Sequence, residues 1–244
     1  MSVDMTKYQA IAKENIHNRP AGEGRLAGKV CIVTGAAQGF GKGIAEELYA
    51  EGATIIIADM NQALAEQVAA EMGERACAIS VNVSNEESVA NLVAQTVEKF
   101  GGLDIMVANA GVVRSGPIAQ FEQKDFEFVT AINYTGLFLC AKYAAIIMQA
   151  QKEADPEASY DIISISSKSG LEGSNKNFAY AGSKFGGLDM MVANAGVVRS
   201  GPIATFEKKD MEFVTAINYT GLFLCAKYAS IDRKSTRLNS SHAT

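Results

Sequence analysis

Three side chains between residues 167 and 184 have the types and spacing needed for proton transfer to or from a carbon-bound oxygen. Tyr180 and Lys184 are four residues apart, so on a helix they would share one face. A phenol is a weak base near neutral pH, but an ammonium beside it stabilises the phenolate form. Such a tyrosine can exchange a proton with a substrate oxygen, to which Ser167 would donate a hydrogen bond. Tyrosine and lysine at this spacing are also common on solvated helix surfaces. Whether this pair is catalytic therefore depends on the motifs in the rest of the chain.

Strands alternate with helices upstream of these residues, and this alternation predicts the frame that positions them. We expect strands at 30–35, 53–59, 76–83, 103–111 and 160–166, and helices at 42–51, 62–72, 86–100 and 124–148. The first strand, VCIVTG, is apolar on both faces, as parallel strands buried between two helix layers are. Right-handed crossovers between such elements build an α/β fold, a doubly wound parallel sheet with the Rossmann-type dinucleotide-binding topology. A further short helix is expected near 8–14, within a polar extension that has no assigned role.

A glycine-rich turn joins the first strand to the helix after it and predicts a phosphate site. The turn consists of Thr34, Gly35, Ala36, Ala37, Gln38, Gly39, Phe40 and Gly41. One glycine permits the tight turn, another lets the backbone approach a pyrophosphate, and the last lets the helix pack on the strand. The free N–H groups and the positive dipole end of the helix then face the anion.

Asp59 ends the second expected strand, about twenty residues after the turn, where the acid of a dinucleotide site belongs. A carboxylate there can accept hydrogen bonds from both ribose hydroxyls of an adenosine. The same charge would repel a 2′-phosphate, and Gln38 supplies no positive charge to offset it. The sequence therefore favours NAD over NADP. The alternative is that Asp59 only caps the helix that begins near Asn61.

Composition and charge argue against several other classes of protein. The net charge of −5 and the pI of about 5.2 disfavour nucleic acid or an anionic membrane as a partner. We identify no continuous apolar run of the ~18 residues that a membrane span needs, and no signal peptide at the N-terminus. The four cysteines are dispersed and the two histidines lie near opposite ends, so neither a metal site nor a Ser-His-Asp triad is expected. We expect a cytoplasmic protein with free thiols.

Together these residues resemble the short-chain dehydrogenase/reductase family, of its common single-domain type. The turn matches the family's T-G-x-x-x-G-x-G pattern, ANAG at 108–111 matches its N-N-A-G, and Asn82-Val83 lies where the family has Asp-Val beside the adenine. The resemblance implies a catalytic set of Asn133, Ser167, Tyr180 and Lys184. It implies a cofactor-binding set of Thr34, Gly35, Gln38, Gly39, Phe40, Gly41, Asp59, Asn82, Val83, Asn109, Ala110, Gly111, Tyr180 and Lys184.

The resemblance also implies a reaction. A hydride would pass between the nicotinamide of NAD and a carbinol carbon while Tyr180 moves the hydroxyl proton. Lys184 would also hold the nicotinamide ribose, and Asn133 would hold a proton-relay water. The sequence around the site is most similar to bacterial members that resemble sorbitol-6-phosphate 2-dehydrogenase, which implies a polyol or sugar phosphate as substrate. Members usually associate through their long helices, so the parent protein is expected to be a homo-oligomer.

The second half of the chain contains a near-copy of the first. Residues 99–146 and 184–231 align at an offset of 85, and 43 of the 48 aligned positions are identical. Structural repeats normally diverge more than this. Residues 232–242, DRKSTRLNSSH, match the in-frame translation of a sequencing-library adapter. We therefore expect a chimeric chain with an extension (1–26), an incomplete dehydrogenase domain (27–187), a near-copy of 103–146 (188–231) and a non-native tail (232–244).

The near-copy stands where the last third of the family fold would be, which leaves three alternatives. The chain could be an active NAD-dependent dehydrogenase, a protein that binds NAD without turnover, or a polypeptide that does not fold. Residues 188–194 have strand character and could fill the sheet edge of the missing strand, and 207–230 would form a helix. Asn194 and Asn218 copy Asn109 and Asn133 but have no expected role.

Overall fold

The structure, a computed structural model, describes residues 3–171, 176–184, 205 and 207–215. The chain forms two compact units. The first consists of Met1–Gly111, Gly136–Ile165 and Pro202–Thr205, and the second of Val112–Thr135, Ser166–Gly201 and Phe206–Thr244. The expected boundaries at 26, 187 and 231 stay predictions.

A parallel sheet forms the centre of the first unit. Its strands are β1 (Val30–Thr34), β2 (Thr54–Asp59), β3 (Ala76–Ser80), β4 (Ile105–Ala108) and β5 (Asp161–Ser164). Within the described residues their order is β3-β2-β1-β4-β5, and every neighbouring pair is parallel. The chain thus starts in the middle of the sheet and winds outward in both directions, which confirms the doubly wound fold class.

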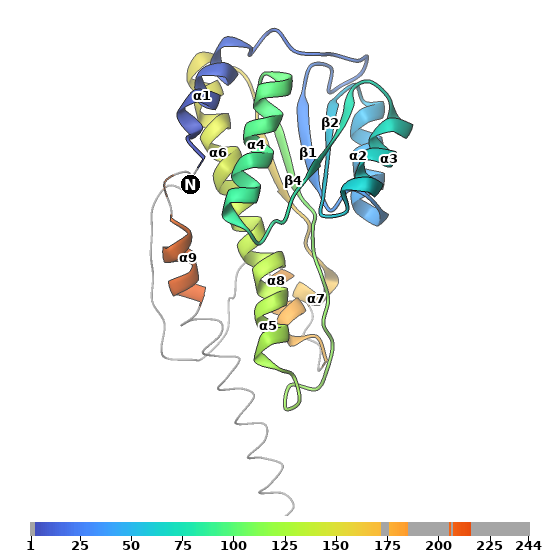
Figure 1. Cartoon of the computed structure of the whole chain (residues 1–244), viewed down its shortest axis with the longest axis vertical. Coiled ribbons are helices and arrows are strands. Elements are labelled where there is room, and N and C mark those ends of the chain that lie inside the picture. Colours follow the sequence, from blue (N-terminus) through green and yellow to red (C-terminus); the bar gives the residue numbers. More distant parts are fainter. Residues whose placement is uncertain (1–2, 172–175, 185–204, 206, 216–244) are drawn as a thin grey trace, which may run out of the picture. The chain divides into compact units, whose positions relative to one another are not determined.

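Helices cover both faces of this sheet. They are α2 (Gly39–Ala50), α3 (Gln62–Met72), α4 (Glu86–Phe100) and α6 (Gly136–Ala154). Figure 1 shows α2 and α3 on one face, and α4 and α6 on the other. Strand side chains alternate between the two layers: Ile55 and Ile57 pack with the α3 side chain Val68, while the intervening Ile56 is fully buried as well. This double burial explains the continuous apolar runs of β1, β2 and β4, whereas the residues of β5 are exposed.

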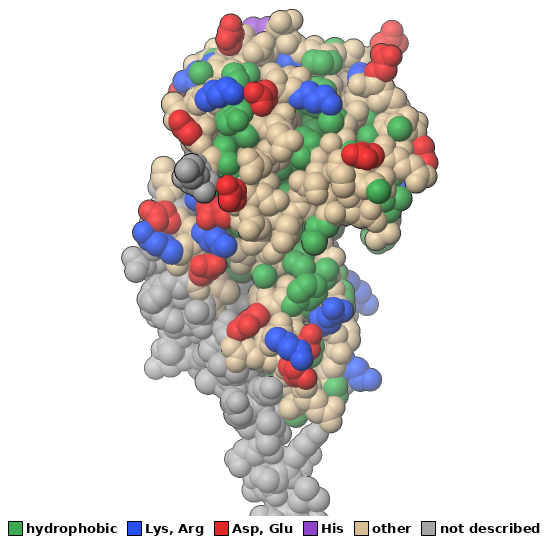
Figure 2. Space-filling view, viewed as in Figure 1, with side chains coloured by type: hydrophobic (Ala, Val, Ile, Leu, Met, Phe, Trp, Pro, Cys, Tyr) green, Lys and Arg blue, Asp and Glu red, His purple; other side chains and the backbone are tan. Residues whose placement is uncertain are grey.

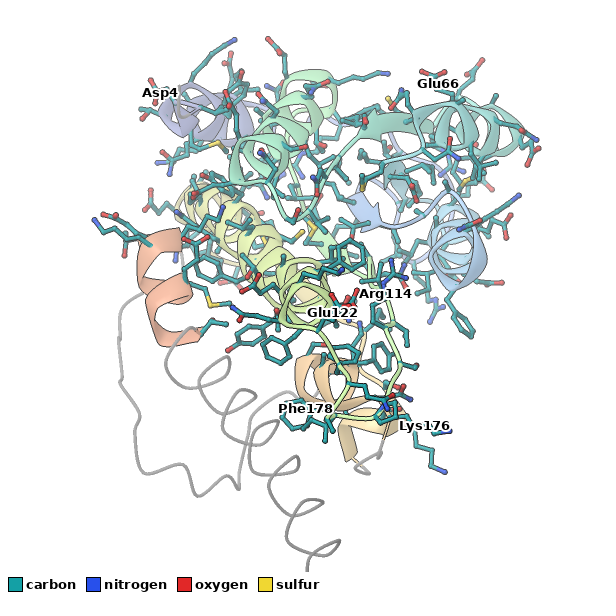
Figure 3. The ribbon with its side chains drawn as sticks, turned by 60° about the horizontal axis from the view of Figure 1, so that its bottom comes forward. Asp4, Glu66, Arg114, Glu122, Lys176 and Phe178 are labelled. Atoms are coloured by element: carbon teal, nitrogen blue, oxygen red, sulfur yellow. The ribbon has the colours of Figure 1, made fainter. Side chains whose placement is uncertain are left out.

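The polar extension, to which the sequence assigns no role, is part of the first unit. Its helix α1 (Met5–Glu14) begins at Asp4, whose side chain caps the first turn (Figure 3), and it lies beside α6 (Figure 1). After the helix, Arg19 Nη1 lies 2.6 Å from Asp104 Oδ2, and the two side chains are 4% and 5% exposed. Asp104 Oδ2 also accepts a hydrogen bond from Val30 N at 2.8 Å. The extension is therefore bonded to the N-terminal ends of the inner strands β1 and β4.

The long helix expected at 124–148 is present and spans residues 123–154. It consists of three consecutive helical segments: α5 (Gln123–Thr130), the π-helical turn η1 (Ala131–Thr135) and α6. Just before η1, Thr130 Oγ1 donates a hydrogen bond to Phe126 O at 2.6 Å, and hydroxyl bonds to the carbonyl four residues back are known to bend helices. The predicted long helix is therefore confirmed, and only its π-helical turn was not foreseen, because hydrophobic periodicity does not register a single such turn.

The helix across residues 123–154 also meets the length and composition requirements of a membrane span, with a mean hydropathy of 1.4 in its most apolar window. A search for uninterrupted apolar runs missed this property. Within that window 56% of the residues are buried inside the fold, as they are in the core helices of soluble proteins. The absence of a membrane partner stays a prediction.

The second unit has a small apolar core of its own. In it Phe126 and Val129 of α5 pack with Ala179 of α8 (Phe178–Lys184), and the rings of Phe126 and Phe178 are 6.3 Å apart between centroids. Figure 3 shows Phe178 on α8. This core holds α8 against α5 and so fixes the helix that carries Tyr180 and Lys184.

Candidate active site

The glycine turn of the first unit, which the sequence predicts to bind a phosphate, leads directly into α2. Gly35 and Gly39 have φ of +66° and +58°, values that side chains disfavour. A Cβ on Gly41 would overlap Gly35 O, so α2 approaches the turn as closely as a glycine allows. Gln38 is the N-cap of α2, and its side chain makes no capping hydrogen bond. The first-turn N–H groups of α2 are therefore not occupied by that side chain.

Thr34 and Asn109 lock the turn to the end of β4. Thr34 Oγ1 accepts hydrogen bonds from Asn109 N and Ala110 N, both at 3.1 Å. In return Asn109 Nδ2 donates to Thr34 O at 2.9 Å and to Gly35 O at 3.3 Å. These bonds give two predicted cofactor residues a structural task, since they set the shape of the turn.

Asp59 is tied to the turn as well as to the residues after its own strand. Its Oδ2 accepts from Ala37 N at 3.1 Å and its Oδ1 from Asn61 N at 2.9 Å. The N-cap of α3 is Asn61, whose side chain accepts from Leu64 N at 3.2 Å. The alternative that Asp59 only caps this helix is therefore wrong.

Two large apolar side chains lie exposed next to these polar groups. Phe40, within the turn, is 89% exposed, and Met60, directly after Asp59, is 68% exposed. Met60 was not singled out from the sequence. Its position directly after Asp59, at the end of a strand, was the one signal that an apolar side chain lies beside this carboxylate. After β3, the side-chain oxygen of Asn82 accepts hydrogen bonds from Ser84 N and Ser84 Oγ, and Val83 is buried.

The second unit contains the residues predicted for proton transfer. Tyr180 and Lys184 both lie on α8, one helical turn apart. Lys184 is half-buried, and burial lowers the pKa of its ammonium below the ordinary value. Its carbonyl accepts a hydrogen bond from Ser166 Oγ at 2.8 Å, which joins the end of α8 to the segment that contains Ser167.

Ser167 directly precedes the short helix α7 (Lys168–Leu171), which contacts α8. Its Oγ accepts a hydrogen bond from Ser169 N at 3.2 Å. A hydroxyl that accepts still has its own hydrogen to donate, so this bond is compatible with the expected contact to a substrate oxygen.

Asn133 lies in the π-helical turn and is 4% exposed. Its Nδ2 donates to Val112 O at 2.9 Å and to Ser183 Oγ at 3.0 Å, while its Oδ1 accepts from Val112 N at 2.8 Å. Both amide hydrogens are therefore used inside the fold, and a relay water would have to bind another atom of the residue. Sequence reasoning missed Ser183, whose only signal was its place next to Lys184.

The predicted residues thus divide between the units. The second unit holds Asn133, Ser167, Tyr180 and Lys184, and the first holds the cofactor residues from Thr34 to Gly111. Residues 188–194, Asn194 and Asn218 lie outside the described part of the chain, as does the predicted helix 207–230 except for α9 (Lys208–Thr215). Within the described residues, no group of three or more His, Cys, Asp and Glu side chains could hold a metal ion. On the face shown in Figure 2, basic and acidic side chains are interspersed.

Sequence profiles of two protein families match the chain. Residues 29–188 match the family described as short chain dehydrogenase. Residues 171–236, which include the whole near-copy, match a profile described as enoyl-(acyl carrier protein) reductase.

Individual relatives match between half and two thirds of the chain. Secoisolariciresinol dehydrogenase of Forsythia intermedia is 41% identical over 165 residues, 66% of this chain and 57% of the relative. Tropinone reductase-like 1 of Erythroxylum coca is 40% identical over 133 residues, 53% of this chain and 49% of the relative. Sorbitol dehydrogenase of Cereibacter sphaeroides is 36% identical over 126 residues, 52% of this chain and 49% of the relative. The chain spans about half the length of these relatives.

Solved structures show the same fold. The 3-ketoacyl-(acyl-carrier-protein) reductase of Brucella melitensis, complexed with NADH, superposes with a TM-score of 0.62 at 30% identity over 65% of each chain. A short chain dehydrogenase/reductase of Burkholderia phymatum, in complex with NAD, superposes with a TM-score of 0.61 at 27% identity. That match covers 66% of this chain and 56% of the other.

Proposed function

Because the chain belongs to the short chain dehydrogenase family, we propose that it is an oxidoreductase that transfers a hydride between NAD and a secondary alcohol or ketone. The observation that carries the proposal is the placement of Tyr180 and Lys184 on one face of α8, with Ser166 joining the end of that helix to Ser167. These groups supply an acid–base phenol, a cation beside it and a hydroxyl donor.

In the oxidation direction, the alcohol oxygen gives its proton to the Tyr180 phenolate as the carbon gives up its hydride. Bound NAD would accept that hydride and become NADH. Ser167 donates a hydrogen bond to the substrate oxygen and holds it in reach of the phenol. Lys184 lies one helical turn from Tyr180 on the same face of α8 and would place its side chain beside the phenol. In the reduction direction, the same phenol returns the proton.

The first unit fits the proposed cofactor. The close approach of α2 to Gly35, the side-chain-free N-terminus of α2 and the carboxylate of Asp59 beside the turn correspond to the pyrophosphate and ribose sites of a dinucleotide. The ligands of the two solved relatives, NADH and NAD, support NAD as the cofactor. Asp59→Ala is expected to reduce the preference for NAD over NADP, and equal kinetics of parent and variant with both cofactors would contradict this assignment.

We propose a polyol or a sugar phosphate as the substrate class. The support is the resemblance around residues 167–187 to proteins like sorbitol-6-phosphate 2-dehydrogenase, together with the 36% identity to a sorbitol dehydrogenase. A panel of sorbitol, sorbitol 6-phosphate and a cyclic secondary alcohol, each with NAD, tests the choice. Turnover of the cyclic alcohol alone would contradict it.

A second candidate is a protein that binds NAD without turnover. One observation favours it: the predicted nucleotide residues from Thr34 to Gly111 all lie in the first unit, while the predicted proton-transfer residues lie in the second. In this proposal the chain is a chimera, in which the near-copy at 188–231 came from a related gene. Amplification of one continuous gene across residues 180–200 from source DNA would contradict the chimera.

One experiment separates the two candidates. The full chain is titrated with NAD by calorimetry and then assayed for NADH formation with the alcohol panel. Binding with turnover, lost in Tyr180→Phe while binding persists, supports the dehydrogenase. Binding without turnover supports the second candidate, and turnover retained by Tyr180→Phe would remove the proton-transfer role of the phenol.

A further inference from the structure

A serine that the sequence did not single out connects two of the segments that carry the predicted catalytic residues. Ser183 directly precedes Lys184 on α8 and is 6% exposed. Its hydroxyl donates to Tyr180 O at 2.8 Å and accepts from Asn133 Nδ2 at 3.0 Å. Because a hydroxyl has a single hydrogen, these two bonds together fix its orientation.

The bond from Asn133 to Ser183 is the one that joins the asparagine to α8. The other two hydrogen bonds of the amide, at 2.9 and 2.8 Å, go to the backbone of Val112, in the loop after β4. Without the serine hydroxyl, one Nδ2 hydrogen would be left in a buried position with no acceptor. An unsatisfied buried donor is costly, so the amide would turn or the π-helical turn would shift.

The location of Asn133 increases the weight of this bond. The residue lies in η1, where the regular pattern of helical hydrogen bonds is interrupted. Backbone bonds therefore define its position less firmly than within an α-helix, and side-chain bonds contribute more.

We propose that Ser183 is a positioning residue for proton transfer, whose hydroxyl holds Asn133 in register with the helix of Tyr180 and Lys184. The inference rests on the proposed function, in which Asn133, Tyr180 and Lys184 take part in the same proton transfer. Ser166 provides a contrast: its hydroxyl donates to Lys184 O at 2.8 Å, but the residue is exposed. Water can replace a lost bond at an exposed site, and it has no comparable access to the buried Ser183.

Hydrogen exchange in the full chain tests the link without any need for turnover. The Val112 amide reports on Asn133, because its N–H is bonded to Asn133 Oδ1. In Ser183→Ala we expect this amide to exchange about tenfold faster or more, and in Ser183→Thr, which keeps the hydroxyl, to exchange at the parent rate. Thr96→Val is the matched control, since it removes a buried hydroxyl that donates to Leu92 O at 2.8 Å within α4. It should leave the Val112 amide unchanged.

Kinetics test the consequence for the reaction. Ser183→Ala is expected to lower kcat for NADH formation about tenfold and to leave the Kd of NAD unchanged, because the hydroxyl bonds to Tyr180 and Asn133, two of the proton-transfer residues. Unchanged Val112 exchange in Ser183→Ala would overturn the proposal, as would faster exchange with parental kcat. If the parent chain shows no turnover while exchange still accelerates, the proposed function fails and the link between Ser183 and Asn133 stands.

Discussion

Two glycines on α2, two residues apart, should respond in opposite ways to the same substitution. A Cβ on Gly41 would overlap Gly35 O and would lie 2.6 Å from Asn109 Nδ2 and 2.9 Å from Gly35 C. A Cβ on Gly43 would meet no other atom within 4 Å. Gly41→Ala therefore tests the close approach of helix and turn, and Gly43→Ala is its control.

The magnitudes follow from these contacts. Alanine is about 1 kcal/mol more favourable than glycine in a helix interior, so Gly43→Ala should raise the free energy of unfolding by up to that amount. Gly41→Ala has the same gain in propensity, but an overpacked site costs about 1–3 kcal/mol, and two of the obstructing atoms belong to the backbone. The net change should be a destabilisation. It should also displace Asn109 from the turn, and the affinity for NAD should fall.

Urea denaturation gives the free energies of unfolding, and calorimetry gives the Kd of NAD for both variants. The expected pattern is a less stable Gly41→Ala with weakened NAD binding and a Gly43→Ala that is as stable as the parent or more stable, with unchanged binding. If Gly41→Ala were as stable as Gly43→Ala and bound NAD equally well, the proposal that NAD binding requires the close packing of α2 on the turn would be refuted.

Three further predictions concern charge and burial. Arg19→Met removes the nearer of two cations from the buried carboxylate of Asp104 and leaves only Lys29 Nζ, at 3.7 Å, so it should cost up to about 3–5 kcal/mol in urea denaturation. Arg25→Met removes an exposed partner at a similar distance and should cost little. Lys184→Met should stabilise the fold near neutral pH, because burial lowers the lysine pKa and the unfolded chain binds the proton better. That gain, followed by urea denaturation, should shrink as pH rises towards about 10. Burial raises the pKa of the Cys31 and Cys140 thiols to about 12, so mass spectrometry should show both reacting slowly with iodoacetamide at pH 8.

Helix ends were predictable where the signals lie in the local sequence. The structure gives α3 and α4 the expected bounds, 62–72 and 86–100. Asn61 and Asn85 cap their first turns, and Gly73 and Gly101 follow them with φ of +112° and +77°. Each of these residues acts on the backbone within a few positions, so no knowledge of tertiary structure is required.

Other features depended on contacts that the sequence does not reveal. α2 begins at residue 39, three residues before the expected start, because the turn that Thr34 and Asn109 shape is continuous with the helix. The buried pair of Arg19 and Asp104 joins residues 85 apart, so a reading of the extension by composition alone assigned it no role. For the same reason, the partners of Asn133 could not be foreseen, since one lies 21 residues before it and the other 50 after it.

The near-copy shows which features depend on the local sequence and which depend on tertiary contacts. α9 (Lys208–Thr215) has the bounds of α5 shifted by 85 residues, although phenylalanine at 126 is replaced by methionine at 211. Even the hydroxyl bond recurs: Thr215 Oγ1 donates to Met211 O at 2.8 Å, as Thr130 Oγ1 does to Phe126 O. The local sequence is therefore sufficient for the helix and its terminal hydrogen bond. The copied segment 99–146 does not include Ser183, so copying reproduces the helix and the asparagine but not the serine that positions it. A proton-transfer role for the asparagine thus requires a partner such as Ser183 on α8. Identity of the local sequence is therefore not sufficient to assign that role to Asn218.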